Sequence, residues 1–310
     1  MKVRKVDRAG VLVKADYAWQ RQITGQEIGI AVMDTGLYPH MDFGNRIVCF
    51  QDFVYHRHGL YDDCGHGTHI AGIAAGNGSM SHGQYRGIAP GASVIACKVL
   101  DYSGNGAVDT VIRGLEWVVR NQQRYNIRIV NISVGTVANG EEDEECELVM
   151  AVNHAWDAGL VVCVAAGNNG PDPYSITMPG ISRKVITVGS SDDREAVEVA
   201  GRMTSDYSGR GPSYSCIIKP DLVAPGSNIY SCQARRQGMR QGRAGYVKKS
   251  GTSMSTPMVS GAAALLLSKF PQLSNADVKK RLCESAADLG WDIRRQGFGM
   301  LDIEGLLSSG

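Results

Sequence analysis

Short, continuously apolar segments alternate with helical segments along most of the chain. The apolar segments have the length and composition of strands and cover residues 28–33, 93–100, 127–133, 160–165 and 184–189. The segments with helical patterns cover residues 67–75, 107–123, 146–158, 253–267 and 274–287. Strands that are apolar at every position must be buried on both faces, as in a parallel sheet covered by helices. The pattern predicts an α/β fold: a doubly wound, mostly parallel sheet with helices on both faces.

The size and charge of the chain limit the classes of function it can have. Its 310 residues are 43% hydrophobic and 20% charged, with a net charge of +1. There is no internal repeat or long linker, so we expect a single domain over residues 1–310, with 1–12 as an N-terminal extension or a propeptide remnant. The small net charge argues against a nucleic-acid partner, and the apolar runs are too short to cross a membrane.

The N-terminus and the cysteines suggest a cellular location. The basic N-terminus is not followed by the apolar core of a signal peptide, so we expect a cytoplasmic protein, or a secreted one if the N-terminus has been trimmed. The eight cysteines have no Cys-x-x-Cys spacing, and Cys97 and Cys163 lie inside apolar runs. We therefore expect free thiols in a reducing compartment.

Polar residues stand at the ends of three predicted strands and at the starts of two predicted helices. Asp34, Ser133 and Asn168 follow strands, whereas His66 and Ser253 open helices. In open parallel sheets, ligands bind beyond the carboxyl ends of the strands. We therefore expect these five side chains to converge on one cleft.

Ser253 opens a helix whose composition indicates that it is buried. Pro257 fits if this helix begins at about Ser253, because a proline in the first turn removes no intrahelical hydrogen bond. A helix N-terminus favours developing negative charge, which suits a nucleophile. Taken alone, the segment favours a serine that only caps the helix, because serine is a preferred cap residue.

The order of residues along the chain excludes one class of hydrolase. Ser253 sits in a segment similar to the nucleophile elbow of α/β-hydrolases, in which the histidine follows the serine. All of the histidines precede Ser253, at positions 40, 56, 58, 66, 69, 82 and 154. A triad in the order Asp–His–Ser is still available, the order found in subtilisin.

Each of the other polar motifs has a structural and a functional interpretation. Asp34-Thr35-Gly36 resembles the pepsin signature, but a second such triplet is absent and the pattern is not all-β. His66 lies between two glycines, as an accessible general base would, and His69 is better suited to a structural role. Zinc bound by both is improbable because no third ligand follows. Asn168 is either a turn residue or an amide donor to an oxyanion.

Taken together, the motifs resemble those of the subtilisin-like serine proteases (subtilases), including intracellular-type bacterial members. The resemblance covers nearly the whole chain, and its motifs occur in the family's order. They are Ala31-Val32-Met33-Asp34-Thr35-Gly36, Asp62-Asp63-Cys64-Gly65-His66-Gly67-Thr68-His69, Val164-Ala165-Ala166-Gly167-Asn168 and Ser250-Gly251-Thr252-Ser253-Met254-Ser255-Thr256-Pro257. Four separate motifs in this order are highly specific.

The resemblance implies a serine endopeptidase acting on proteins or peptides. Ser253 would attack the carbonyl, His66 would transfer the proton, and Asp34 would orient the imidazole. Asn168 and the Ser253 backbone N–H would hold the oxyanion. The rival hypothesis is a silent, peptide-binding pseudoprotease, which need not keep all four residues. Nothing in the sequence indicates the oligomeric state.

The family's substrate groove can be placed on this sequence residue by residue. The resemblance implies that two backbone segments pair with the peptide, Gly104-Asn105-Gly106 and Ser133-Val134-Gly135. A small apolar pocket would involve Val108, Val111 and Val134. The pocket next to the scissile bond would have Ala165, Ala166 and Gly167 as its wall and Thr177 near its floor. No cofactor is required for the chemistry; structural calcium, with Asp42 at a frequent ligand position, is an expectation without an assigned metal site.

Several residues depart from the family pattern or carry a further hypothesis. Ser255 replaces the more usual alanine, and Thr136 replaces a second glycine. Cys64 would border the site, where it could react with mercurials or be inert. The acidic run Glu141–Glu147 is more typical of a solvated helix start than of a device that attracts basic substrates.

Overall fold

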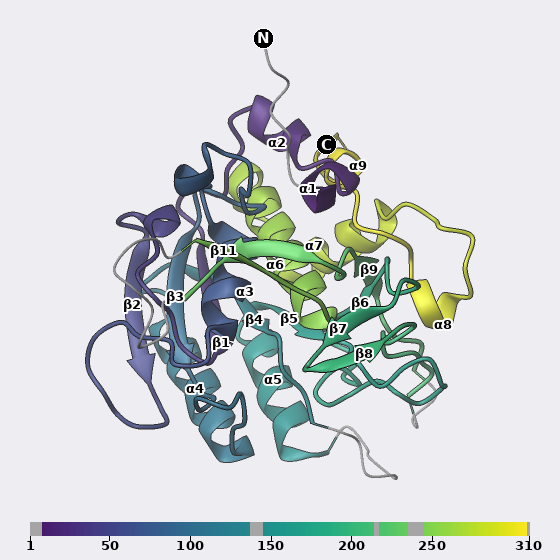
Figure 1. Ribbon diagram of the computed structural model, residues 1–310, viewed down its shortest axis with the longest axis horizontal. Helices are drawn as coiled ribbons and strands as arrows, with labels where there is room; N and C mark the ends of the chain where they lie inside the picture. The colour runs from purple at the N-terminus through teal and green to yellow at the C-terminus, as the bar shows by residue number, and fades with distance from the viewer. Residues whose placement is uncertain (1–7, 137–144, 214–216, 235–244, 309–310) are drawn as a thin grey trace.

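A seven-stranded parallel sheet forms the centre of the structure, a computed structural model that describes residues 8–136, 145–213, 217–234 and 245–308 (Figure 1). The strand order is β2-β3-β1-β4-β5-β6-β9, and every neighbouring pair is parallel. The strands are β1 (Gly29–Asp34), β2 (Ile47–Asp52), β3 (Ser93–Lys98), β4 (Ile127–Ile132), β5 (Val161–Ala165), β6 (Ile186–Ser190) and β9 (Leu222–Ala224). The predicted α/β parallel sheet is confirmed.

Helices cover both faces of this sheet. One face is packed by α4 (Val108–Asn121) and α5 (Glu147–Asp157), and the other by α3 (His66–Ala75), α6 (Thr252–Lys269) and α7 (Asn275–Glu284). Strand β1 shows the alternation: Ile30 and Val32 join the core beneath α3 and α6, whereas Ala31 and Met33 join the core beneath α4 and α5. Burial on both faces explains why these strands are apolar throughout.

The two ends of the described chain lie together. The N-terminal helices α1 (Arg8–Leu12) and α2 (Asp16–Gln20) lie near the C-terminal helix α9 (Ile303–Ser308) (Figure 1). Lys14 Nζ lies 2.6 Å from Asp302 Oδ2, and the Ile303 N–H donates to the Val13 carbonyl. The remaining short helices are the 3₁₀ turns η1 (Met41–Phe43) and η2 (Ser79–Ser81), and α8 (Ile293–Gln296).

Two small antiparallel hairpins lie outside the central sheet. They are formed by β7 (Val197–Val199) with β8 (Arg202–Thr204), and by β10 (Ile229–Cys232) with β11 (Tyr246–Lys249). The sequence pattern predicted neither hairpin, because each strand has only three or four residues. In the basic segment 235–249, the last four residues form β11, and residues 235–244 lie outside the described part of the chain.

The strand order reverses at the centre of the sheet, and this positions the cleft. From β1 the chain builds β2 and β3 on one side, then crosses to build β4, β5, β6 and β9 on the other. Asp34 ends β1 and Ser133 follows the neighbouring β4. A topological switch point of this kind leaves a crevice at the carboxyl ends of the strands. Helices α3 and α6 begin beside this edge.

A close approach beneath α6 depends on Gly261. A Cβ atom at this position would lie 2.6 Å from Ile88 Cβ and 3.0 Å from the Ala74 carbonyl oxygen at the end of α3. Both distances are shorter than a side-chain carbon tolerates, so even alanine must push the two elements apart. The absence of a side chain therefore allows α6 to pack deep in the core.

We expect Gly261→Ala to lower the free energy of unfolding by about 1–2 kcal/mol, because overpacking outweighs the gain in helix propensity. Urea titration of a Ser253→Ala background, which lacks the predicted nucleophile, measures the change. The control is Gly245→Ala, where an added Cβ would meet no atom within 4 Å. Equal stability of the two variants would show that the contact does not limit packing.

Candidate active site

Asp34 and His66 form a hydrogen-bonded pair between the end of β1 and the start of α3. Asp34 ends β1 and is fully buried, and His66 is the first residue of α3. His66 Nδ1 lies 2.8 Å from Asp34 Oδ1 and 2.9 Å from Oδ2, and Asp34 Oδ1 also accepts the Thr35 N–H. Because a carboxylate only accepts, the shared proton lies on Nδ1. In the neutral imidazole, Nε2 then carries no proton and is available as a base.

The carboxylate of Asp62 ties the loop after β1 to the start of α3. Its Oδ1 accepts the Thr35 hydroxyl at 2.8 Å and the Gly65 N–H at 2.7 Å. Its Oδ2 accepts both the N–H and the hydroxyl of Thr68, and the Thr35 hydroxyl in turn accepts the Gly67 N–H. This network sets the distance between Asp34 and His66. The sequence motif contained Asp62 without indicating this role.

Lys98 supports the same corner and was missed by the sequence analysis. Its side chain is fully buried at the end of β3, and Nζ donates to the carbonyls of Thr35 and Leu100 at 2.6 and 2.8 Å. Nζ also lies 2.7 Å from Asp63 Oδ1. A lysine inside an otherwise apolar predicted strand was the available signal, because a buried charge needs partners.

Ser253 lies in the first turn of α6, where Gly251 is the N-cap. The serine therefore does not cap the helix. Pro257 was expected in the first turn, but it is the sixth residue of α6 and leaves the Ser253 carbonyl without an intrahelical partner. The Ser133 hydroxyl supplies one at 3.0 Å. Ser133, which follows β4, thus supplies the hydrogen bond that Pro257 cannot donate to the Ser253 carbonyl.

The Ser253 hydroxyl donates to the Ser133 carbonyl at 2.7 Å. No hydrogen bond joins it to His66 in the described part of the chain, although both residues line the same cleft. Transfer of its proton to His66 Nε2 therefore requires the side chain to turn about its Cα–Cβ bond. Catalytic hydrogen bonds are often formed only in the substrate complex.

Asn168 is held with its amide in one orientation. Its Oδ1 accepts the N–H and the hydroxyl of Thr252 at 2.9 and 3.1 Å. Since Oδ1 is engaged, the Nδ2 donors are free of protein acceptors among the described residues, and Asn168 lines the cleft with Ser253. The Ser253 backbone N–H, near the helix N-terminus, is likewise without an acceptor in that part of the chain. The two groups are suited to bind an anion.

A cavity of about 700 Å³ contains most of the predicted groove residues. His66, Asn168 and Ser253 line it together with Gly104, Ser133, Val134, Gly135, Gly167 and Thr177. Thr177 packs against Gly135 and Gly167, since a Cβ on either glycine would lie 2.5 or 2.6 Å, respectively, from its hydroxyl oxygen. Ala166 does not line this cavity, because its side chain is buried with Ile176 and Ile181 behind it.

A second, smaller cavity of about 160 Å³ adjoins this groove. Its lining includes Asn105 and Gly106 together with Val108, Val111 and Val134. The three valines of the predicted apolar pocket are therefore in one place. Asn105 is exposed, and its amide donates to the Ser103 hydroxyl.

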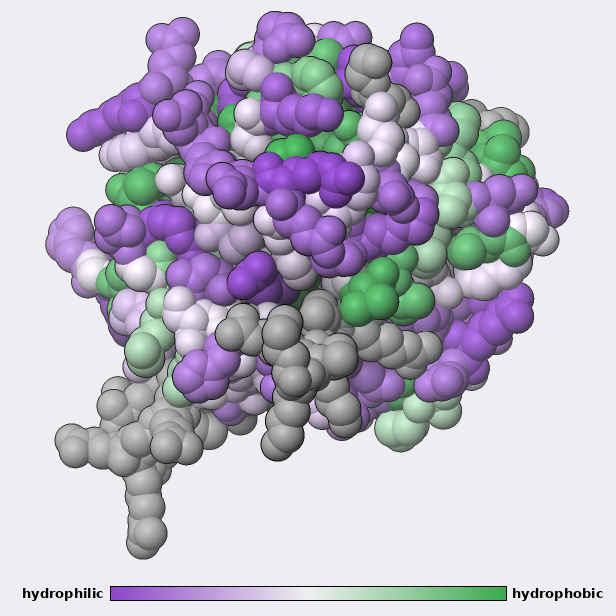
Figure 2. Space-filling model, turned by 90° about the horizontal axis from the view of Figure 1, so that it is seen from above, coloured by the Kyte–Doolittle hydropathy of each residue, from purple (hydrophilic) through white to green (hydrophobic). Residues whose placement is uncertain are grey.

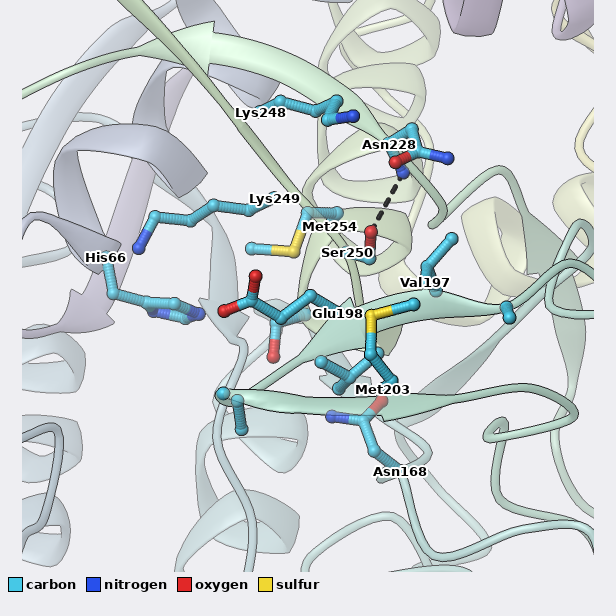
Figure 3. Close-up of a pocket in the computed structure, with 15 residues that line it drawn as sticks. His66, Asn168, Val197, Glu198, Met203, Asn228, Lys248, Lys249, Ser250 and Met254 are labelled. Carbon is cyan, nitrogen blue, oxygen red and sulfur yellow. Dashed lines mark hydrogen bonds between the residues drawn. The ribbon is translucent and has the colours of Figure 1, made fainter.

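A third cavity, of about 520 Å³, opens on the other side of the site (Figure 3). It shares His66, Asn168 and Ser253 with the large groove. The β7–β8 hairpin and the end of β11 form its remaining walls. These walls carry Glu198, Met203, Lys248 and Lys249. None of these four residues was predicted from the sequence to line the site, because neither hairpin was predicted.

His69 and Cys64 lie close to the site. His69 is fully buried, and its Nε2 lies 3.1 Å from the carbonyls of both Ile229 and Val247, so it joins α3 to the β10–β11 hairpin. Among the described residues, the group that could hold a metal includes neither His66 nor His69. Cys64 is half-buried in the groove wall, and burial raises the pKa of its thiol.

Comparison with known proteins identifies the same architecture and motifs. The sequence model of the subtilase family matches residues 25–300. Serine protease AprX of Bacillus subtilis (strain 168) is 44% identical over 270 residues, which are 84% of this chain and 61% of AprX. Subtilisin Savinase of Lederbergia lenta is 34% identical over 293 residues, which are 94% of this chain and 95% of Savinase.

Solved structures with this fold also come from subtilisin-like enzymes. Sphericase superimposes with a TM-score of 0.75 at 32% identity, covering 90% of this chain and 92% of its own. A cold adapted subtilisin-like serine proteinase gives a TM-score of 0.70 at 31% identity, covering 90% and 89% of the two chains.

We expect His69 to make the fold sensitive to acid. Burial lowers the pKa of His69 to about 3 from its usual value near 6.5. Below pH 6.5 the unfolded chain binds a proton that the folded chain excludes, so stability present at neutral pH is lost as the pH falls from about 6.5 towards 3. At pH 4.5 the loss is about 3 kcal/mol.

Urea titrations at pH 7 and pH 4.5, in the Ser253→Ala background, test this expectation. His69→Gln retains a donor for the two carbonyls but does not titrate, so its stability should fall less between the two pH values. His154→Gln, at an exposed histidine, is the matched control and should behave like the parent. An identical pH dependence in His69→Gln would contradict the assignment.

Proposed function

This chain belongs to the subtilase family of serine proteases, and we propose that it is an endopeptidase that cleaves proteins or peptides through Ser253, His66 and Asp34. The observation that carries the proposal is the single cleft in which these groups meet. His66 is oriented by Asp34, and Ser253 lies at a helix N-terminus beside the amide of Asn168. A binding protein would have no need for a base, a nucleophile and an anion site in one place.

The proposed reaction begins with the Ser253 hydroxyl attacking the scissile carbonyl carbon. His66 Nε2 takes the hydroxyl proton, and the resulting imidazolium is stabilised by Asp34 at Nδ1. Negative charge develops on the carbonyl oxygen, where Asn168 Nδ2 and the Ser253 N–H would donate. His66 then passes its proton to the leaving amine, which departs as the acyl-enzyme forms. Water attacks the ester by the same steps.

The large groove and the apolar cavity are proposed to hold the acyl side of the substrate. Gly104 and residues 133–135 line the groove, and 104–106 line the adjoining apolar cavity, so both segments are available to pair with an extended peptide. Thr177, packed against Gly135 and Gly167, would limit the depth of the pocket next to the scissile bond. The wall previously expected from Ala166 would be backbone only, since its side chain faces the core.

We propose that the chemistry needs no cofactor, and that Asp42 does not hold the calcium ion expected from the resemblance. Calcium takes six to eight oxygen ligands. Asp42 Oδ1 accepts the Met80 N–H, and Oδ2 accepts the Tyr246 hydroxyl and the Cys232 thiol. The nearby metal-binding groups are His40 and Cys232, which offer nitrogen and sulfur.

A protein cation supports the same corner. The guanidinium of Arg46 donates to the carbonyls of Asp42, Ala75 and Ala92 at distances of 2.5 to 2.8 Å. The Arg46 guanidinium thus binds several backbone carbonyl oxygens, as a metal ion could. This supports the proposal that the loop near Asp42 is organised without calcium.

We propose a cytoplasmic location and no nucleic-acid or membrane partner. The seven described cysteines are free thiols, which supports a reducing compartment. In the described part of the chain, no helix is both long and apolar enough to span a membrane. One face of the molecule is mainly hydrophilic, with apolar residues in small separate patches (Figure 2). The acidic run at 141–147 lies largely outside the described residues, and its attraction of basic substrates is still a prediction.

A serine-directed phosphonate tests the proposal. We expect one equivalent of label per chain, attached to Ser253, and none in Ser253→Ala. Intact mass spectrometry with peptide mapping measures both. Ser255→Ala is the matched control and should still be labelled, because the Ser255 hydroxyl donates to the buried Ala224 carbonyl. A folded wild-type chain that takes up no label would favour the silent pseudoprotease.

Asn168→Ala should lower kcat with little change in KM, because the amide is proposed to act on the oxyanion and not on bound substrate. The expected loss is about 10² to 10³ in kcat, the size established for the equivalent amide of subtilisin, a member of this family. Steady-state kinetics on a peptide substrate measures it. Asn169→Ala, at the exposed neighbouring residue, is the control. A rise in KM at unchanged kcat would assign Asn168 to ground-state binding.

A further inference from the structure

The cavity bounded by the β7–β8 hairpin and β11 lies on the leaving-group side of the scissile bond. The segments proposed to bind the acyl side, 133–135 and the region of Thr177, line the large groove and are absent from this cavity. The two spaces meet only at the catalytic groups and at a few residues of the hairpin and β11. A peptide that crosses Ser253 must therefore leave the site through this space.

The hairpin presents Glu198 to the cavity. Val197 and Val199 are buried against Tyr207, so the residue between them faces outwards. Glu198 is exposed and lines the cavity, and its side chain points to the side on which His66 lies (Figure 3). The base of the hairpin is anchored, because the Asp206 N–H donates to the Asp193 carbonyl and Arg295 bonds to both carboxylates.

Strand β11 presents Lys249 from the opposite wall. Lys248 and Lys249 point in opposite directions, as neighbours on a strand must, and the ammonium group of Lys249 is directed towards His66 (Figure 3). Burial is the main cause of the lowered pKa of His69, and the positive charge of Lys249 adds to it; at Cys64 the same charge opposes the rise in pKa that burial causes, which agrees with this position. Lys249 is half-buried and lines both the cavity and the groove.

Neither charge is neutralised by a neighbour in the part of the chain that the structure describes. No ion pair or side-chain hydrogen bond involves Glu198 or Lys249 there. Two unpaired, opposite charges thus face each other across a cavity that the substrate must cross. An extended peptide places successive side chains on opposite sides, so its first two residues after the scissile bond face opposite walls.

We propose that Glu198 and Lys249 select leaving peptides whose first two residues carry opposite charges, a basic side chain towards Glu198 and an acidic one towards Lys249. The inference rests on the proposed peptidase function and extends it to the substrate class. Reversed order would place like charges together at both walls, which is unfavourable. The enzyme would therefore distinguish a basic-acidic pair from an acidic-basic pair at these two positions. The two substrates would have the same composition and the same net charge.

The test uses two internally quenched peptides that differ only in these two residues, Lys-Glu or Glu-Lys, with the cleavage point confirmed by mass spectrometry. We expect wild-type kcat/KM values to differ by about fivefold or more between them, as two partly exposed ion pairs would produce. Glu198→Gln and Lys249→Met should each reduce this ratio. The double variant Glu198→Lys/Lys249→Glu should invert it. Because each ratio is taken within one variant, a general loss of activity cancels.

Glu195→Gln and Lys280→Met are the matched controls, since both residues are exposed and outside the cavity, and they should leave the ratio unchanged. The ratio should also shrink at about 1 M salt, where exposed charges are screened. A wild-type ratio near one, or a ratio that the double variant does not invert, would overturn this inference while leaving the peptidase function intact. Failure of folded wild-type protein to cleave either peptide or to take up phosphonate would instead count against the function itself.

Discussion

The contact between the end of β4 and the start of α6 is the interaction on which the site depends. Ser133 and Ser253 exchange two hydrogen bonds, hydroxyl to carbonyl in each direction, at 3.0 and 2.7 Å. Asn131 extends the link by donating to the Ser133 hydroxyl and accepting from Ser260 one helical turn or more along α6. In a buried setting these polar groups must all be paired, so they tolerate only one position of the helix along the strand. That position places Ser253 at the sheet edge where β1 delivers Asp34.

Burial then determines how charge is used around the cleft. Asp34, Asp62 and Lys98 are buried and fully engaged with hydrogen-bond donors or acceptors, so they hold geometry. His69 is excluded from water and stays neutral, which allows it to bridge two carbonyls between α3 and the outer hairpin. Glu198 and Lys249, by contrast, line the cavity, and neither forms an ion pair within the part of the chain that the structure describes. The same side-chain types act as framework when buried and as recognition groups when accessible.

The sequence was sufficient to predict a parallel sheet and its strands β1, β3, β4, β5 and β6. Strands 28–33 and 127–133 could be predicted because most of their residues are apolar, and the observed strands begin and end within one residue of these limits. Elements whose stability comes from distant contacts were missed. The β7–β8 hairpin is held by Tyr207 beneath it and by Arg295 at its base, and β11 exists only through its pairing with β10. Their short strands carry no periodicity that a local pattern could reveal.

Periodicity and spacing in the chain determined that a parallel sheet forms, and that an aspartate, a histidine, an asparagine and a serine stand where strands end or helices begin. These are local properties, because a strand buried on both faces and a helix N-terminus each favour particular residue types at neighbouring positions in the sequence. Only the tertiary structure decided how the groups are oriented. Ser133 donates to the Ser253 carbonyl the hydrogen bond that Pro257 cannot, Thr252 fixes the orientation of the Asn168 amide, and the Ala166 side chain faces the core. The first two outcomes depend on hydrogen bonds between residues more than eighty positions apart in the sequence. The third depends on which side of a strand end faces the core. Such contacts are formed by the folded chain and have no signature in the neighbouring sequence.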